Sequence, residues 1–280
     1  MSAPAPSGLR RWGAYLALTI VFAVVCGLLS WWQWSRRAET VAEIDKVSAN
    51  YDQSPVPVDE LLPALDAWDE AVEWRPVALH GTYLVDDQVL ARNRPRDGAP
   101  GFEVLTPLLL DDGTVFVVNR GWLPTGSAQD SPDDVPAPPD GDVDVVARLK
   151  AGEPTLLGRT APEGQLATIH LESIAELVGE PTYTGAYGLL ASEDPAVADM
   201  PAPAVKPEAD EGPHLSYALQ WIAFGILAFA GLFWAFRRER RFAALPEEEQ
   251  AAARASDRAA RGRSADSDEE DALLDAHDKR

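Results

Sequence analysis

Two long runs of apolar residues without a single charge dominate the pattern of the chain. Residues 12–34 read WGAYLALTIVFAVVCGLLSWWQW, and residues 215–236 read LSYALQWIAFGILAFAGLFWAF. With a rise of about 1.5 Å per residue, a helix of this length crosses the roughly 30 Å of a bilayer's hydrocarbon core. Both runs carry tryptophan and tyrosine near their ends, where aromatic rings prefer the membrane interface. The pattern therefore predicts two transmembrane helices, at residues 12–35 and 214–236.

A cleaved signal peptide and a buried core helix are the alternatives for the first run. The run is longer than a signal sequence needs, and the WWQW at its end lacks the small residues of a cleavage site. We therefore interpret it as an uncleaved membrane anchor. Cys26, the only cysteine, falls within this run. No disulfide can frame the fold, and Cys26 is expected to act as a small apolar packing residue.

Arginines flanking the runs predict the orientation. The first run has two arginines on each side, whereas four arginines follow the second run and a single lysine lies near its start. The positive-inside rule then places both termini in the cytoplasm and residues 38–213 outside the plasma membrane of a bacterium. Residues 38–213 hold ten Lys/Arg and thirty-three Asp/Glu, within a chain of formal net charge −21. This acidity excludes nucleic acid as a partner and indicates a solvated domain, with the lipid bilayer as the surface contacted by the apolar runs.

Between the two runs the pattern changes to short apolar segments separated by turns, which is typical of β-strands. Apolar residues alternate with polar ones in the segment that begins at residue 142, as in a half-buried strand. Asp112-Gly113 predicts a tight hairpin, because glycine tolerates the positive φ that such a turn needs. We predict strands at residues 74–83, 88–93, 103–110, 114–119, 142–150 and 182–190.

The remaining segments predict helices, loops and tails. The first membrane helix is expected to continue through residues 38–47, and short helices are expected at 59–65 and 170–178. Residues 127–141 are rich in proline and aspartate and predict a mobile loop. The predicted organisation is a cytoplasmic tail (1–11), a domain (38–190), a Pro/Ala-rich linker (191–213) and a charged cytoplasmic tail, disordered with some helix (237–280). The fold class is therefore a membrane protein of the α+β type, with two transmembrane helices flanking a mostly β extracytoplasmic domain.

The sequence offers no recognisable catalytic machinery. One cysteine and four scattered histidines do not provide the spacing of a metal cage, and there is no phosphate-binding glycine loop or nucleophile elbow. The carboxylates are spread evenly, as on a solvated surface. We therefore expect a binding protein rather than an enzyme, with no catalytic residue.

His214 stands at the predicted outer end of the second membrane helix, in the sequence GPHLSYALQW. Helical spacing places His214, Tyr217 and Trp221 on one face. A neutral imidazole there could ligate haem iron while the aromatic side chains contact the macrocycle. From the residues alone, an interfacial histidine without a ligand remains the alternative.

Four arginines fall within thirty positions of a very acidic domain, at the ends of neighbouring predicted strands: Arg92, Arg94, Arg96 and Arg120. A guanidinium binds carboxylates through two parallel hydrogen bonds, so the group could receive haem propionates or an acidic partner. Internal ion pairs with Asp97, Asp111 or Glu103 are the alternative. The sequence VFVVNRGW at residues 115–122 ends in one of these arginines. We expect its strand to leave the core at Asn119-Arg120, to turn at Gly121 and to fold Trp122 back as a cover.

Three stretches together resemble a known family. WWQWSRR, then VLARNRPRDGAPGFEVLTPLLLDDGTVFVVNRGWLP, and finally HLSYALQW occur in this order. They are similar to the surfeit-locus family of cytochrome oxidase assembly factors, over about residues 27–236. The resemblance implies one helix, an extracytoplasmic domain and a second helix. It also implies a role in maturing the haem-a-containing subunit of cytochrome c oxidase.

The resemblance gives the candidate residues their expected roles. His214 corresponds to the family's haem-associated histidine, which makes transient binding of haem a, with His214 as the iron ligand, the leading hypothesis. Tyr217 and Trp221 would contact the ring, while Arg92, Arg94 and Arg120 would face propionates or a partner. Expected partners are the haem-bearing oxidase subunit and haem a synthase. A haem-free membrane scaffold that stabilises oxidase subunits is the alternative.

Overall fold

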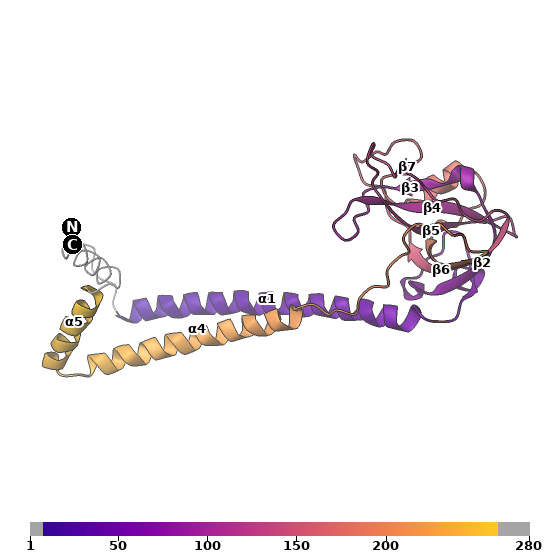
Figure 1. Cartoon of the computed structure of the whole chain (residues 1–280). Coiled ribbons are helices and arrows are strands. Elements are labelled where there is room, and N and C mark those ends of the chain that lie inside the picture. Colours follow the sequence, from indigo (N-terminus) through magenta and orange to yellow (C-terminus); the bar gives the residue numbers. More distant parts are fainter. Residues whose placement is uncertain (1–7, 263–280) are drawn as a thin grey trace, which may run out of the picture. The chain divides into compact units, whose positions relative to one another are not determined.

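The computed structural model describes residues 8–262, which form two compact units (Figure 1). One unit combines Met1–Ala38 with Gly212–Arg280, of which the described part is helical. The other unit, Glu39–Glu211, contains all the strands. The first helix, α1 (Gly8–Asn50), is uninterrupted, so its last turns belong to the β unit.

The helical unit pairs the first part of α1 with α4 (His214–Ala243). Both helices are long and apolar enough to cross a membrane, by length and composition. Ser30 Oγ donates a hydrogen bond of 3.0 Å to the carbonyl of Ala218, a buried residue of α4. Cys26 is also buried, and its Cβ lies 3.8 Å from the position that a Cβ at Gly225 would take. The predicted packing role of Cys26 is confirmed.

α5 (Glu247–Gly262) follows α4 in the region for which the sequence predicted disorder with some helix. Three glutamates in its first turn favour a helix start, because negative charge there interacts with the positive end of the helix dipole. Alanine-rich sequence then sustains the helix. The predicted tails at residues 1–7 and 263–280 lie outside the described residues.

The β unit is built on one sheet that closes on itself. The order β1-β2-β6-β8-β5-β4-β3-β7 gains a further pairing between β2 and β4, so five strands form a closed barrel (Figure 1). Most pairs are antiparallel, whereas three pairs run parallel: β1–β2, β3–β7 and β5–β8. The strands are β1 Val56–Pro57, β2 Pro76–Tyr83, β3 Val89–Ala91, β4 Gly101–Leu110, β5 Val115–Pro124, β6 Asp142–Ala151, β7 Gln165–Leu166 and β8 Ala186–Asp194.

Alternation of buried residues divides the core into two clusters on opposite faces of the sheet. Leu108 and Phe116 belong to the larger cluster, together with the predicted alternating residues of β6. The smaller cluster lies under α3 (Leu171–Val178), which packs Leu171 and Ile174 against β3, β4 and β5. Short helical segments complete the unit: α2 Val58–Leu61, η1 Glu70–Val72 and η2 Val85–Asp87.

The β4–β5 hairpin confirms one prediction and corrects another. Gly113 has φ +82° and donates to the Leu110 carbonyl, as the predicted Asp112-Gly113 turn requires. At the other end β5 continues to Pro124 rather than leaving the core at Asn119. Val104 pairs with Gly121 and Leu105 with Asn119, so Arg120 is the extra residue of a β-bulge. Gly121, at φ +136°, shapes the bulge rather than a turn.

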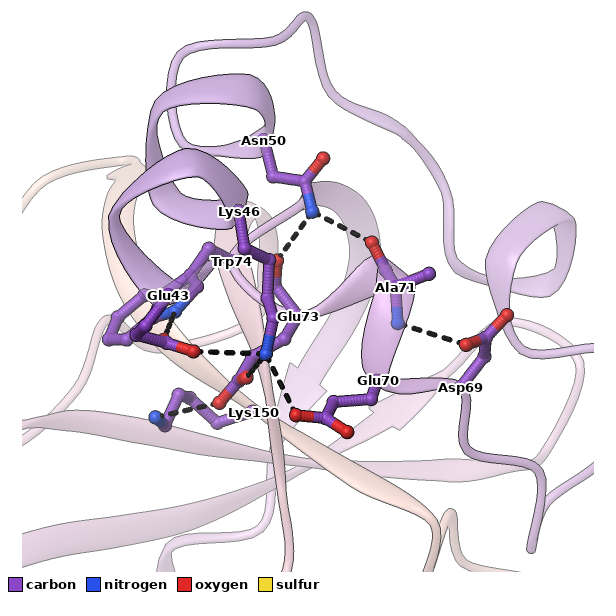
Figure 2. Close-up of polar contacts among 9 residues, drawn as sticks. All are labelled: Glu43, Lys46, Asn50, Asp69, Glu70, Ala71, Glu73, Trp74 and Lys150. Atoms are coloured by element: carbon purple, nitrogen blue, oxygen red, sulfur yellow. Dashed lines mark hydrogen bonds and ion pairs between the residues drawn. The ribbon is translucent and has the colours of Figure 1, made fainter. Parts of the chain in front are cut away.

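Charged side chains hold the last turns of α1 against the barrel (Figure 2). Lys46 Nζ lies 3.0 Å from Glu43, 3.0 Å from Glu70 and 2.9 Å from Glu73. Burial lowers the pKa of Lys46, but the hydrogen bonds that Lys46 donates to these three carboxylates outweigh it and raise the pKa well above its usual value. Asn50 donates to the carbonyls of Ala71 and Glu73, at 2.8 Å each. The helix end is therefore part of the β unit and not a free extension.

The proline-rich segment 127–141 has no helix or strand, as predicted, but it is attached to the barrel at several points. Pro132, Pro138 and Pro139 are buried. Gln165 donates to the Asp130 carbonyl at 3.3 Å. The predicted linker is also shorter than expected, because β8 extends to Asp194 and pairs its acidic end with β6.

Candidate functional site

His214 is the first residue of α4 and contacts α1 within the helical unit. Its Nδ1 lies 2.9 Å from Oε1 of Gln33. Because an amide oxygen only accepts, Nδ1 donates in this bond and Nε2 keeps its lone pair. A hydrogen bond at one ring nitrogen is how proteins orient a histidine that ligates metal through the other.

Space next to the free nitrogen comes from Gly212. A Cβ built at Gly212 would lie 3.6 Å from Nε2 of His214, in ordinary van der Waals contact, so a side chain there would cover this side of the ring. The positive φ of +65° at Gly212 also favours glycine. The glycine therefore keeps one side of the imidazole open.

Tyr217 and Trp221 follow His214 at helical spacing on the same side of α4. Tyr217 is 47% exposed, and Trp221 is partly buried and contacts Phe224 edge to face at 5.8 Å. Ala218, on this side as well, packs on α1. The three predicted residues therefore lie along one side of α4, and their action as one binding group stays a prediction.

The four arginines of the β unit take different positions. Arg92 pairs with Asp130, and Arg94 holds Glu153 through two nitrogens at 2.8 and 2.5 Å. Arg96 donates to the carbonyls of Ala202 and Pro203 at 3.3 and 3.0 Å. The guanidinium of Arg96 also lies over the Trp122 ring, 5.9 Å from its centroid.

Arg120 lies in the core, and its side chain is fully buried. It donates to the carbonyls of Pro136 and Ala137 at 2.7 and 3.1 Å, and it pairs with the fully buried Glu193 at 3.7 Å. Burial lowers the pKa of Arg120, and the charge of Glu193 opposes this. The side chain does not reach the surface, because the bulge turns it into the barrel. The predicted role of Arg120, to face haem propionates or a partner, does not fit this buried position.

Arg94 and Arg96 line a pocket of about 430 Å³ in the β unit. Its other charged residues are Glu103 and Lys150, and its walls include Trp74 and Trp122. Trp122 Nε1 donates to the Arg94 carbonyl at 2.7 Å, and Lys150 Nζ lies 4.1 Å from the Trp74 ring centroid. Both indoles are therefore fixed. Trp122 reaches the pocket from within β5 and not by folding back after a turn, as was predicted.

Acidic groups around the pocket differ in proton affinity. Burial raises the pKa of Glu103, and the nearby Arg94 only partly offsets this. Burial also acts to raise the pKa of Glu153, but hydrogen bonds from Arg94 and the Ile169 N–H lower it below its usual value. The pocket thus combines a carboxyl that takes up protons readily with cations that are already paired. It suits a polar group with donor and acceptor atoms better than a free anion.

The structure groups the predicted residues in two places: His214, Tyr217 and Trp221 in the helical unit, and the arginines in the β unit. Spacing in sequence could not identify Gln33 as the partner of His214, since the two are 181 positions apart. Glu153 was also missed, because it follows β6 outside any motif. Within residues 8–262 no group of three or more His, Cys, Asp or Glu side chains could hold a metal ion.

Comparisons with known proteins agree with the resemblance noted in the sequence. An uncharacterized SURF1-like protein of Mycobacterium tuberculosis is 35% identical over 226 residues, covering 79% of this chain and 82% of that protein. The cytochrome oxidase assembly protein SHY1 of Saccharomyces cerevisiae is 26% identical over 120 residues, covering 41% of this chain and 30% of that protein. The model of the SURF1 family matches residues 20–226, which include the Ser30–Ala218 contact between α1 and α4 and the whole barrel. The chain belongs to the SURF1 family.

Proposed function

We propose that the protein is an assembly factor for haem-a-containing cytochrome c oxidase and not an enzyme. Membership of the SURF1 family supports this role, as does the similarity to a yeast protein named for cytochrome oxidase assembly. The partner would be the haem-bearing subunit of the oxidase, with haem a synthase as a second partner. The absence of a metal-binding cluster among the described residues is compatible with a factor that handles haem only in passing.

The proposed location is the plasma membrane of a bacterium, with the β unit outside and both termini in the cytoplasm. The two apolar helices support insertion in the lipid bilayer. Arg237, Arg238, Arg240 and Arg241 at the end of α4 support the orientation, because positive residues are retained on the cytoplasmic side. His214 would then lie at the extracytoplasmic surface of the plasma membrane.

Within this role, His214 is proposed to bind haem a through Nε2. The observation that carries this proposal is the Nδ1–H bond to Gln33, which leaves Nε2 available and fixes the ring. When bound, the haem supplies an iron that accepts a histidine nitrogen as axial ligand. Gln33 orients the imidazole, Gly212 leaves room beside Nε2, and Tyr217 and Trp221 offer aromatic surface to an apolar ring.

One protein ligand also suits transient binding. A carrier has to release its cargo, and a single histidine on a partly exposed helix end holds haem less firmly than an enclosed pocket. Arg92 and Arg94 are proposed to contact the propionates or the oxidase subunit. Both already pair with acidic residues of the β unit, so an incoming carboxylate would have to compete with Asp130 or Glu153.

That competition favours a second candidate, a scaffold that never binds haem. If the arginines serve the internal ion pairs alone, the β unit would act by contacting oxidase subunits through its surface. The two candidates differ in a simple observation: a carrier purified from cells that make haem a shows a Soret band, and a scaffold copurifies with oxidase subunits without one.

The test compares haem uptake by purified full-length variants. His214→Ala is expected to abolish uptake, and Gln33→Leu to weaken it by about 10- to 100-fold, as for other residues that orient a ligand. Gln220→Leu, the same substitution at an exposed position of α4, is the control and should bind like wild type. Uptake of haem a by His214→Ala equal to wild type would disprove the ligand assignment. Normal haem a content in the oxidase of a deletion strain would count against the assembly role itself.

A further inference from the structure

An apolar recess lies between the first turns of α1 and the last turns of α4, in the helical unit. Its volume is about 450 Å³, and it is lined by Trp12, Gly13 and Leu16 of α1 and by Phe229, Phe233 and Phe236 of α4. Gly13 creates part of the space, since a Cβ built there would meet nothing within 4 Å. Trp12 and Phe236 contact each other edge to face, with ring centroids 5.1 Å apart.

A cationic recess of about 510 Å³ shares Phe233 and Phe236 with the apolar one. Its remaining wall includes Arg237, Arg240 and Arg241. The guanidinium of Arg237 lies 5.5 Å from the Phe233 ring centroid, and that of Arg240 lies 5.5 Å from the Phe236 centroid. The same phenylalanines thus form the floor of the apolar recess and support the cations.

These arginine charges are not compensated by the described residues. Glu239 is the only acidic residue in the RRERR sequence, and it pairs with Arg11 of α1. Within residues 8–262, Arg237, Arg240 and Arg241 form no ion pair. An anion placed over the three would therefore not have to displace an internal partner.

We propose that the two recesses form one binding site for an anionic phospholipid, with an acyl chain in the apolar recess and the phosphate on the three arginines. Arginines near a membrane boundary also set topology, but topology does not require an apolar recess that leads to them. Basic pockets between membrane helices recognise anionic headgroups. A soluble anion would use only the cationic half, and a zwitterionic lipid would bring its own cation beside the arginines. This proposal rests on the proposed membrane location.

The test measures lipid binding to the full-length protein in detergent micelles by native mass spectrometry. Phosphatidylglycerol and phosphatidylcholine with the same acyl chains are titrated in parallel. The wild type is expected to prefer phosphatidylglycerol. The triple variant Arg237→Gln/Arg240→Gln/Arg241→Gln should lose this preference, by about a hundredfold, from a contribution of about fivefold per arginine.

Gly13→Leu tests the apolar half, because its side chain fills the recess. It should weaken binding of both lipids, whereas Gly27→Leu should leave binding unchanged. Gly27 is the matched control: it lies in α1 outside the recess, and a Cβ there also meets nothing within 4 Å. Circular dichroism of each variant verifies that the helices are intact.

Equal affinity of the wild type for the two lipids, or unchanged binding by Gly13→Leu, would overturn the proposal. Displacement of phosphatidylglycerol by millimolar inorganic phosphate would show that only the cationic recess binds a ligand, and this would overturn the proposal too. A protein that stays in solution without detergent would instead refute the membrane location, which separates that failure from failure of the lipid site.

Discussion

Replacing Arg120 by methionine should destabilise the β unit more than any other single arginine substitution in it. Methionine fills much of the same space but removes the positive charge. Glu193, whose side chain is also fully buried, would then lose its ion-pair partner. Among the described residues, the Tyr83 hydroxyl would remain in contact with that carboxylate, because it donates to the other Glu193 oxygen at 3.1 Å.

The expected cost is about 3–5 kcal/mol, the usual result of removing one partner of a buried ion pair. Lost bonds to the Pro136 and Ala137 carbonyls contribute less, because Ala137 is exposed and water can replace the guanidinium there. For a unit of this size, each kcal/mol lowers the unfolding temperature by about 2–4 °C, so a decrease of about 6–20 °C is expected.

The assay is thermal unfolding of the full-length protein in detergent, followed by near-ultraviolet circular dichroism. Arg159→Met, at an exposed arginine, is the control and should change the unfolding temperature by less than about 2 °C. Arg120→Met/Glu193→Gln should recover about half of the loss, because the amide is neutral and still accepts from Tyr83. The reasoning fails if Arg120→Met costs less than about 1 kcal/mol, or if the double variant is no more stable than the single one.

Further predictions concern the bulge, the helix end and acid. Gly121→Ala should cost about 1–3 kcal/mol of unfolding free energy, since its Cβ would lie 2.5 Å from the Ala202 carbonyl oxygen. Gly113→Ala is the control: Gly113 has a positive φ but a Cβ there meets no clash, so this variant should cost less in the same thermal assay. Lys46→Met should lower the free energy of unfolding by about 1–3 kcal/mol and speed proteolysis near residue 50. An unchanged cleavage pattern would argue that the ion pairs of Lys46 do not hold the end of α1 on the barrel. The pKa of Glu153 is lower in the folded protein than in the unfolded chain. Ionised Glu153 therefore stabilises the fold at a pH above its unfolded pKa, and this stabilisation is lost as the pH falls below about 4.5. Arg94→Met should reduce this loss of stability on acidification. If the unfolding temperatures of wild type and variant changed in parallel between pH 3 and 7, the prediction would be contradicted.

The sequence predicts local elements of this protein better than their pairing. Both long apolar helices, the hairpin at Gly113 and the buried face of β6 follow from periodicity and turn chemistry, and all are present. Closure of the barrel by β2 and β4 could not be predicted, because it depends on strand contacts that no local pattern encodes. The acidic end of β8 was missed for the same reason: its residues belong to a strand only because β6 pairs with them.

For the candidate site, the residue types could be predicted from the sequence, but their surroundings could not. His214 was singled out correctly as a polar residue at a helix start, yet its partner Gln33 emerges only when the helices pair. Arg120 looked equivalent to Arg94 in the sequence. A single extra residue in β5 turns Arg120 inward, whereas Arg94 lines a pocket. A bulge of this kind changes the face of the sheet to which a side chain points. Residue spacing alone therefore predicts the wrong face.

The position of β8 in the barrel determines when the β unit can fold during synthesis. β8 is the last strand in sequence, but it lies between β5 and β6 in the sheet. Until residue 194 has been synthesised, β5 and β6 lack the strand that pairs with both of them, and their unpaired backbone edges favour aggregation. Chains that end prematurely before this point therefore lack a complete barrel, however much of the sequence they retain. Folding of the unit is therefore delayed until nearly all of it has been synthesised.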